Sequence, residues 1–144
     1  MSMLTKLALI ISACICFLIP LGSLVYFVIK DKKLLKSFFI GIAIFFISQI
    51  AIRIPIINYV LPNHDWYLSM SLNPWIYSIF LALTAALVEE VGRYIAFKYL
   101  LKNNRTYNDG IACGIGHGGI ESILMTGISC ITVLVGSFIG NDMF

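Results

Sequence analysis

Residues 7–29 form an apolar run of 23 residues that contains no charged side chain. At a rise of about 1.5 Å per residue, a helix of this length crosses the hydrocarbon core of a bilayer. The whole chain agrees: it is 60% hydrophobic and 12% charged, whereas a soluble domain is about half apolar and about a quarter charged. The sequence therefore predicts an integral membrane protein, and it excludes a soluble domain, a disordered tail and a nucleic-acid-binding module.

Three further apolar runs follow the first. We expect an all-α fold, a polytopic membrane helical bundle of about four transmembrane helices that form one membrane domain over residues 1–144. Arg53 is expected to end the second helix, and the segment 54–73, which carries prolines and aromatic side chains, is expected to be a loop at the headgroup level. The predicted spans are about 7–29, 37–52, 74–101 and 110–139.

Lysine and arginine side chains concentrate in two of the predicted loops, around residues 30–36 and 98–105. Short cytoplasmic loops of membrane proteins are enriched in these residues. We therefore expect both loops to face the cytoplasm, while the N-terminus, the 54–73 loop and residues 141–144 face outward.

Five glutamate, arginine and histidine residues lie within the third and fourth predicted spans. A charged side chain at the centre of a membrane helix costs roughly 2.5–3.5 kcal/mol, so such residues need a reason. A structural ion pair or snorkelling towards the interface is one explanation, and a catalytic or transport site is the other. Two adjacent carboxylates favour the functional explanation, because one arginine neutralises only one of them. The five candidate site residues are Glu89, Glu90, Arg93, His117 and Glu121.

Helical periodicity distinguishes the two glutamates of the third span. Glu89 falls within a stripe of small residues, where membrane helices pack closely, whereas Glu90 is flanked by bulky side chains. Arg93 lies four residues after Glu89 and three after Glu90, so it reaches either carboxylate. Glu89 is therefore the expected working carboxylate and Glu90 its support. The small residues of the stripe are Ala82, Ala85, Ala86, Gly92 and Ala96.

The fourth span begins with glycines at four-residue intervals, Gly110, Gly114 and Gly118. Glycine costs up to about 1 kcal/mol in a helix interior, so we expect this ladder to pack closely against the third span. His117 and Glu121 lie four residues apart on one face of the span. If spans three and four form a hairpin, all five polar residues fall in one layer.

The segment Glu89-Glu90-Val91-Gly92-Arg93 and the later segment Gly114-Ile115-Gly116-His117-Gly118-Gly119-Ile120-Glu121 together resemble the YhfC family of glutamic-type intramembrane (metallo)proteases. That family is similar in turn to the CPBP group of CAAX-processing proteases. The resemblance implies an intramembrane endopeptidase of a bacterial plasma membrane. Its substrate would be a membrane-embedded protein or a hydrophobic peptide.

Members of this family are typically longer, and the wider group has a second histidine motif downstream. The other histidine of this chain, His64, lies in the predicted outward loop. We therefore expect the chain to be truncated at its C-terminus or to be a shortened, inactive relative.

Within such a site, Glu89 would activate water as a general base, His117 would donate to the oxyanion, and Glu121 would orient His117. This favoured mechanism requires no cofactor. The alternative is a zinc ion held by Glu89, His117 and Glu121. We rank it second because catalytic zinc sites usually draw on two or more histidines.

Two other classes of function stay open, a non-enzymatic membrane protein of the bacteriocin-immunity type and a fragment of a proton-coupled transporter. The segment 7–52 has no membrane-embedded acid, which favours a single site over an ion pathway. The expected partners are the lipid bilayer and the peptide substrate, with no nucleic acid.

Overall fold

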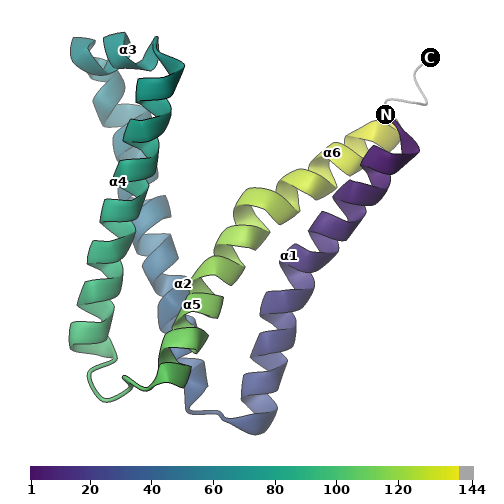
Figure 1. Ribbon diagram of the computed structural model, residues 1–144, viewed down its shortest axis with the longest axis vertical. Helices are drawn as coiled ribbons and strands as arrows, with labels where there is room; N and C mark the ends of the chain where they lie inside the picture. Colours follow the sequence, from purple (N-terminus) through teal and green to yellow (C-terminus); the bar gives the residue numbers. More distant parts are fainter. Residues whose placement is uncertain (140–144) are drawn as a thin grey trace. The chain divides into compact units, whose positions relative to one another are not determined.

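The computed structural model describes residues 1–139, and all the regular structure in this range is helical (Figure 1). Within this range, four segments are long and apolar enough to cross a membrane. The predicted all-α fold with about four long membrane helices is confirmed. The prediction for residues 141–144 lies outside the described residues. The four segments are Met3–Lys30, Leu34–Asn63, Pro74–Leu100 and Tyr107–Ile139.

Several of these segments change helix type along their length. The first is the single helix α1, while π-helical stretches (η) interrupt or extend the other three, and the short helix α3 connects the second segment to the third. The bounds are α1 (Met3–Lys30), α2 (Leu34–Phe45), η1 (Phe46–Arg53), η2 (Ile56–Val60), the 3₁₀ turn η3 (Leu61–Asn63), α3 (Asp65–Ser71), α4 (Pro74–Ile95), η4 (Ala96–Leu100), α5 (Tyr107–Glu121), η5 (Ser122–Gly127) and α6 (Ile128–Ile139).

The prediction that Arg53 ends the second helix is wrong. The helical segment continues through Arg53 and Pro55 as far as Asn63. The guanidinium is satisfied inside the fold, because its Nη2 donates to the carbonyl of Leu81 at 2.6 Å. The Ile54 N–H bonds to the carbonyl of Gln49, a π-type pairing that lets the helix continue into the proline.

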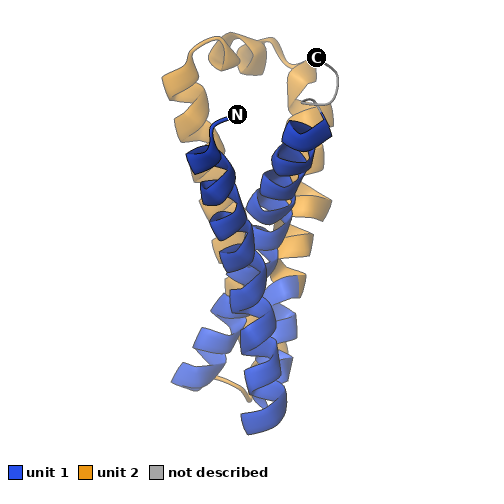
Figure 2. Ribbon diagram, turned by 90° about the vertical axis from the view of Figure 1, so that its right-hand side faces the viewer, with its two compact units in different colours: residues 1–42, 106–144 blue, residues 43–105 orange. Residues whose placement is uncertain are grey.

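The chain divides into two compact units, coloured separately in Figure 2. Unit 1 comprises residues 1–42 and the chain from 106 onward, and unit 2 comprises residues 43–105. In unit 1, α1 packs along α5, η5 and α6, as Figure 1 shows. The core of this unit is formed by Phe27, Leu34, Phe38 and Ala112.

Glycines bring α5 very close to its neighbours in unit 1. A Cβ built on Gly116 would lie 2.0 Å from the carbonyl oxygen of Phe38, and one on Gly119 would lie 2.6 Å from the Cβ of Pro20. The helix therefore touches both α2 and α1 so closely that no side chain fits between them.

Within unit 1, the predicted glycine ladder is not the close-packed face of α5, while its packing against the third span, which lies in unit 2, stays a prediction. A Cβ built on Gly110, Gly114 or Gly118 would meet no atom within 4 Å. The close contacts of α5 come instead from Gly116 and Gly119, which lie on another face of the same helix. Helical spacing identified both sets of glycines, but it did not indicate which set has a neighbour.

Asp109 fixes the start of α5. Its Oδ2 accepts hydrogen bonds from the backbone N–H and the hydroxyl of Thr106, while the Thr106 side chain accepts from the Asp109 N–H, which completes a capping box. Its Oδ1 accepts from the Ser37 hydroxyl at 2.7 Å. One buried carboxylate therefore caps α5 and joins it to α2.

In unit 2, α4 packs against η1 and α3 packs against the start of α4. A Cβ on Gly92 would lie 3.2 Å from the Ile44 side chain, so part of the predicted small-residue stripe of α4 does face the second helical segment. Near α3, the buried Tyr67 contacts the rings of Trp66, Tyr77 and Phe80.

Candidate functional site

The carboxylate of Glu89 is held by a side chain from the second helical segment. Gln49, in η1, donates from Nε2 to Glu89 Oε1 at 2.5 Å. Gln49 is 5% exposed, and the Glu89 side chain is 17% exposed. A hydrogen-bond donor therefore meets this carboxylate inside the apolar part of unit 2.

Arg53 fixes the orientation of the Gln49 amide. Its Nη1 donates to Gln49 Oε1 at 3.0 Å, and its Nε donates to the hydroxyl of Thr84 at 3.4 Å. Because the amide oxygen is occupied by the guanidinium, the amide nitrogen is directed to Glu89. Arg53, Gln49 and Glu89 thus form a hydrogen-bonded chain in which each group has a defined direction.

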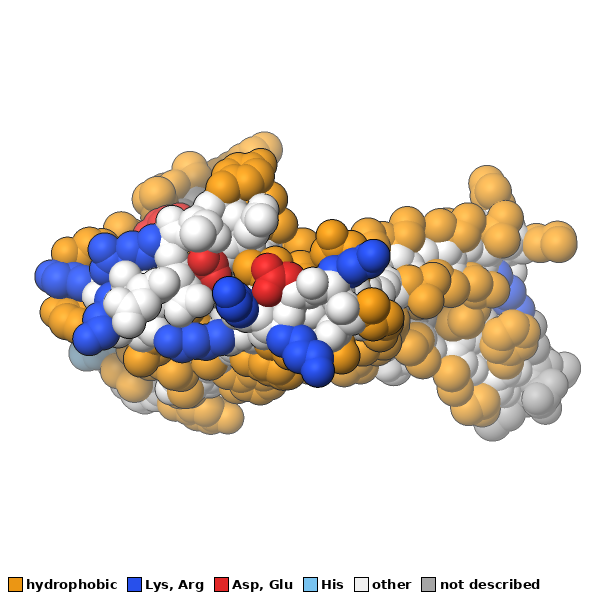
Figure 3. All heavy atoms as spheres, turned by 90° about the horizontal axis from the view of Figure 1, so that it is seen from below, with side chains coloured by type: hydrophobic (Ala, Val, Ile, Leu, Met, Phe, Trp, Pro, Cys, Tyr) orange, Lys and Arg blue, Asp and Glu red, His pale blue; other side chains and the backbone are white. Residues whose placement is uncertain are grey.

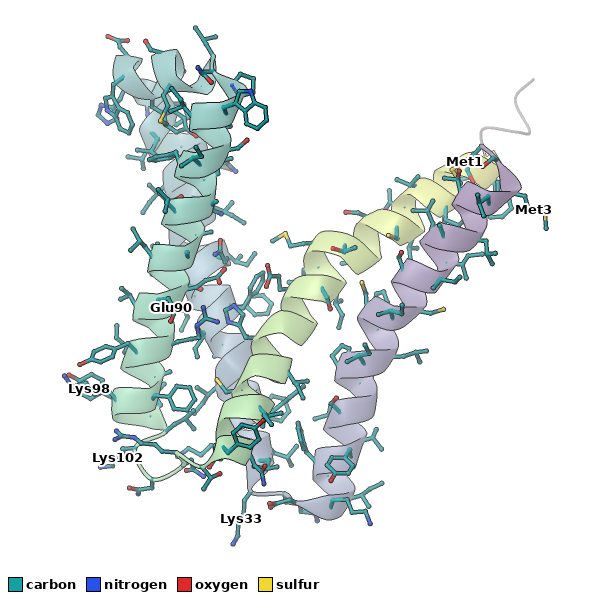
Figure 4. All side chains as sticks on the ribbon, in the orientation of Figure 1. Met1, Met3, Lys33, Glu90, Lys98 and Lys102 are labelled. Atoms are coloured by element: carbon teal, nitrogen blue, oxygen red, sulfur yellow. The ribbon has the colours of Figure 1, made fainter. Side chains whose placement is uncertain are left out.

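Arg93 pairs with both glutamates, but unequally. Its Nη2 lies 2.5 Å from Glu90 Oε1 and 3.9 Å from Glu89 Oε2. The Glu90 side chain is 69% exposed, and Figure 4 labels it on α4. The predicted difference between an inward Glu89 and an outward Glu90 is confirmed.

The remaining two predicted residues belong to unit 1. His117 is 5% exposed, and a Cβ on Gly41 of α2 would lie 2.9 Å from its backbone nitrogen. Glu121, the last residue of α5, is exposed. Glu89, Glu90 and Arg93 are thus brought together in unit 2, whereas the convergence of all five residues in one layer stays a prediction.

Sequence reasoning missed Gln49 and the role of Arg53. A signal existed for Gln49, since an amide in the middle of an apolar run must find a partner there. Nothing in the sequence pointed to Glu89, forty positions away, as that partner. Arg53 was expected to end the second helix, although two of its partners, Leu81 and Thr84, lie on the neighbouring α4.

The network has two cations and two acids, so it carries no net charge when all four are ionised. Glu89 receives a neutral amide donor at hydrogen-bond distance, while the guanidinium of Arg93 is closer to Glu90. Gln49 therefore fixes the position of the Glu89 carboxylate.

Four candidate membrane helices and a half-buried ionisable group held between two of them define a polytopic helical membrane protein with an internal polar site. The model of the YhfC intramembrane metalloprotease family matches residues 15–143. The chain belongs to this family, which confirms the resemblance drawn from the two motifs.

The chain is also similar to a curated bacterial protein, the uncharacterized membrane protein YhfC of Bacillus subtilis (strain 168). The two are 38% identical over 134 residues, which cover 93% of this chain and 52% of the relative. The chain thus spans about half the length of that relative. No solved structure matches the chain.

The description of the family implies a metal ion. Catalytic zinc sites use three protein ligands and leave one position for water. Among residues 1–139, no three His, Cys, Asp or Glu side chains gather closely enough to hold a metal ion. Within each unit, the described residues do not by themselves fit a catalytic metal centre.

Proposed function

We propose that this chain contributes the glutamate of the catalytic site of an intramembrane peptidase, with Glu89 as the group that takes a proton from the attacking water. The observation that carries the proposal is the hydrogen-bonded chain from Arg53 through Gln49 to Glu89. An ionisable residue inside a membrane helix is a functional candidate by default. An ionisable residue that a buried amide holds in position is a stronger candidate.

Glu89 is preferred to Glu90 because of its surroundings. A general base must keep a fixed position relative to its water, and Glu89 is held at 17% side-chain exposure by Gln49. Glu90 is largely exposed and pairs with Arg93 at 2.5 Å. We assign Glu90 the role of keeping Arg93 beside Glu89.

The proton transfers in this proposal are those of ordinary peptide hydrolysis. Glu89 accepts a proton from water as the oxygen attacks the carbonyl carbon, which gives a tetrahedral oxyanion. The C–N bond then breaks, and the proton passes to the leaving amine, so that the products are a carboxylic acid and an amine. His117, buried in α5, is our candidate donor to the oxyanion.

The substrate class follows from the environment of the site. Glu89 lies in a segment of 27 residues that is apolar enough to cross a membrane. A peptide bond that reaches this carboxylate must enter an apolar medium, so we propose membrane-embedded or hydrophobic peptides as substrates. Glu121 is exposed at the end of α5 and has no role in the proposal.

The test is a cleavage assay on the full-length protein in liposomes, with an apolar helical peptide that carries a fluorophore and a quencher as the probe. Hydrolysis by the wild type and a loss of at least ~10²–10⁴ in rate for Glu89→Gln would support the proposal. No hydrolysis by the wild type, or full activity of Glu89→Gln, would contradict it. If Glu89→Gln instead loses a metal ion that the wild type retains, Glu89 is a ligand and not the base.

A further inference from the structure

A second polar feature of unit 2 lies beyond the Glu89 network, where α4 passes through η4 into the following turn. A cavity of about 710 Å³ opens there, and we call it the basic pocket. Figure 3 views the chain from the C-terminal end of α4 and shows exposed lysine and arginine side chains. The pocket is lined by Glu90, Arg93, Tyr94, Phe97, Lys98 and Arg105.

The pocket carries an excess of positive charge. Three cations line it against one acid, and that acid, Glu90, is already paired with Arg93. Neither Lys98 nor Arg105 forms an ion pair within residues 1–139. Two cationic side chains in the pocket therefore lack an anionic partner.

Both of these cations are held in place. Lys98 Nζ donates to the hydroxyl of Tyr94 at 3.1 Å and lies 5.2 Å from the centre of the same ring. Arg105 donates from Nε to the carbonyl of Phe97 at 3.1 Å and from Nη2 to that of Lys98 at 3.2 Å. Arg105 thus covers carbonyls at the negative end of the helix, which would otherwise repel an anion, and it retains further N–H donors.

One wall of the pocket is apolar and belongs to a membrane helix. Tyr94 is 63% exposed, and Phe97 lies beside it. Tyrosine side chains are typical of the membrane interface, where one end is apolar and the other is wet. An anion bound here would meet cations beside the exposed apolar surface of a membrane helix, along which an acyl chain would lie.

We propose that the basic pocket binds the phosphodiester headgroup of an anionic membrane lipid, with Lys98 and Arg105 as its ligands. Basic pockets on membrane helices recognise such headgroups, and arginine suits phosphate because its planar fork forms paired hydrogen bonds. The volume lies within the range of about 300–1,000 Å³ that is usual for small-ligand sites. Free phosphate shares this chemistry, but it has no acyl chain to lie along the apolar surface of the helix.

The experiment is native mass spectrometry of the full-length protein in detergent, with phosphatidylglycerol or phosphatidylcholine added. Lys98→Gln/Arg105→Gln removes two charges from the pocket. The matched control, Lys32→Gln/Lys33→Gln, removes two charges from an exposed loop outside it (Figure 4 labels Lys33). At about 1 kcal/mol for each cation, the affinity for phosphatidylglycerol should fall about 30-fold in the pocket variant. The control should match the wild type.

The single variant Lys98→Gln keeps the helix-covering contacts of Arg105 and should lose about fivefold in affinity by the same arithmetic. Equal retention of the two lipids by the wild type, or equal losses in the pocket variant and the control, would overturn the proposal. Displacement of phosphatidylglycerol by inorganic phosphate that binds equally tightly would overturn the lipid assignment in favour of free phosphate.

Discussion

The amide of Gln49 donates to the carboxylate of Glu89 at 2.5 Å, although the two residues lie forty positions apart in the sequence. This hydrogen bond joins the second and third helical segments. The other end of the amide is held by Arg53 at 3.0 Å. An amide that is bound at both ends is a rigid support, so Gln49 fixes where the Glu89 carboxylate lies.

Replacing Gln49 should therefore weaken the fold as well as the site. In Gln49→Leu, Glu89 loses its amide donor in an apolar environment, and we expect a loss of about 1–3 kcal/mol in the free energy of unfolding. Ser48→Ala is the matched control, because the Ser48 hydroxyl donates to the carbonyls of Ile44 and Phe45 in its own helical segment. Unfolding by titration with sodium dodecyl sulfate measures both. Equal stabilities of the two variants would show that the Gln49–Glu89 bond contributes nothing.

The two sets of glycines in α5 should respond in opposite ways to alanine. Gly116→Ala places a methyl group 2.0 Å from the carbonyl of Phe38, and overpacking of this kind costs about 1–3 kcal/mol. Gly114→Ala meets no atom and gains up to about 1 kcal/mol of helix propensity. The same unfolding titration should therefore place the two variants on opposite sides of the wild type. A destabilised Gly114→Ala with an unchanged Gly116→Ala would contradict the packing of α5.

Tyr67, which lies outside the membrane segments, should ionise at a higher pH than an ordinary tyrosine. Burial, followed by its hydrogen bond to the Tyr77 hydroxyl, raises the pKa of Tyr67 from 10.0 to about 12. Below pH 10 the phenol is neutral in both the folded and the unfolded protein. Between pH 10 and about 12 only the unfolded protein loses the proton, so stability falls as the pH rises.

An ultraviolet titration of the tyrosines follows this ionisation. Tyr67→Phe should remove the latest transition, and Tyr77→Phe should lower the pKa of Tyr67, because the hydrogen bond favours the neutral phenol. If Tyr67→Phe leaves the titration curve unchanged above pH 11, the local structure around α3 is wrong.

The orientation in the membrane stays a prediction from the charge pattern. Lys33 and Arg105 should face the cytoplasm, whereas Asp65 should face outward, because short cytoplasmic loops collect lysine and arginine. Single cysteines are placed at these positions in a background without the native cysteines. Labelling from outside then shows which positions face outward. Labelling of the Asp65 and Arg105 positions from the same side would rule out a third span between them.

The sequence predicted what depends on local pattern. Apolar length located the membrane helices, and helical periodicity distinguished Glu89 from Glu90, because both signals are properties of a single helix. The predictions that failed depend on contacts with neighbouring helices. Arg53 was expected to end a helix, and this was wrong because two of its acceptors lie on α4, which the local sequence does not show.

The partner of Gln49 also depends on tertiary contacts. A neutral amide in an apolar run needs a partner, but the run contains no information on which of the distant acids supplies it. The glycines of α5 are similar, because spacing defines the faces of a helix and only the tertiary contacts define which face is covered. Motif recognition helped most where residues are adjacent, as in the segment from Glu89 to Arg93.

The most direct test of the account compares two substitutions at neighbouring positions. Glu89→Gln and Glu90→Gln each replace one carboxylate by an amide of the same shape, and both should retain the helical circular dichroism of the wild type. In the cleavage assay with the full-length protein, Glu89→Gln should lose at least ~10²–10⁴ in rate, as expected for a missing general base. Glu90→Gln should lose much less, because that side chain is 69% exposed and its carboxylate pairs with Arg93. Equal losses, or a larger loss in Glu90→Gln, would contradict the assignment of Glu89 as the base.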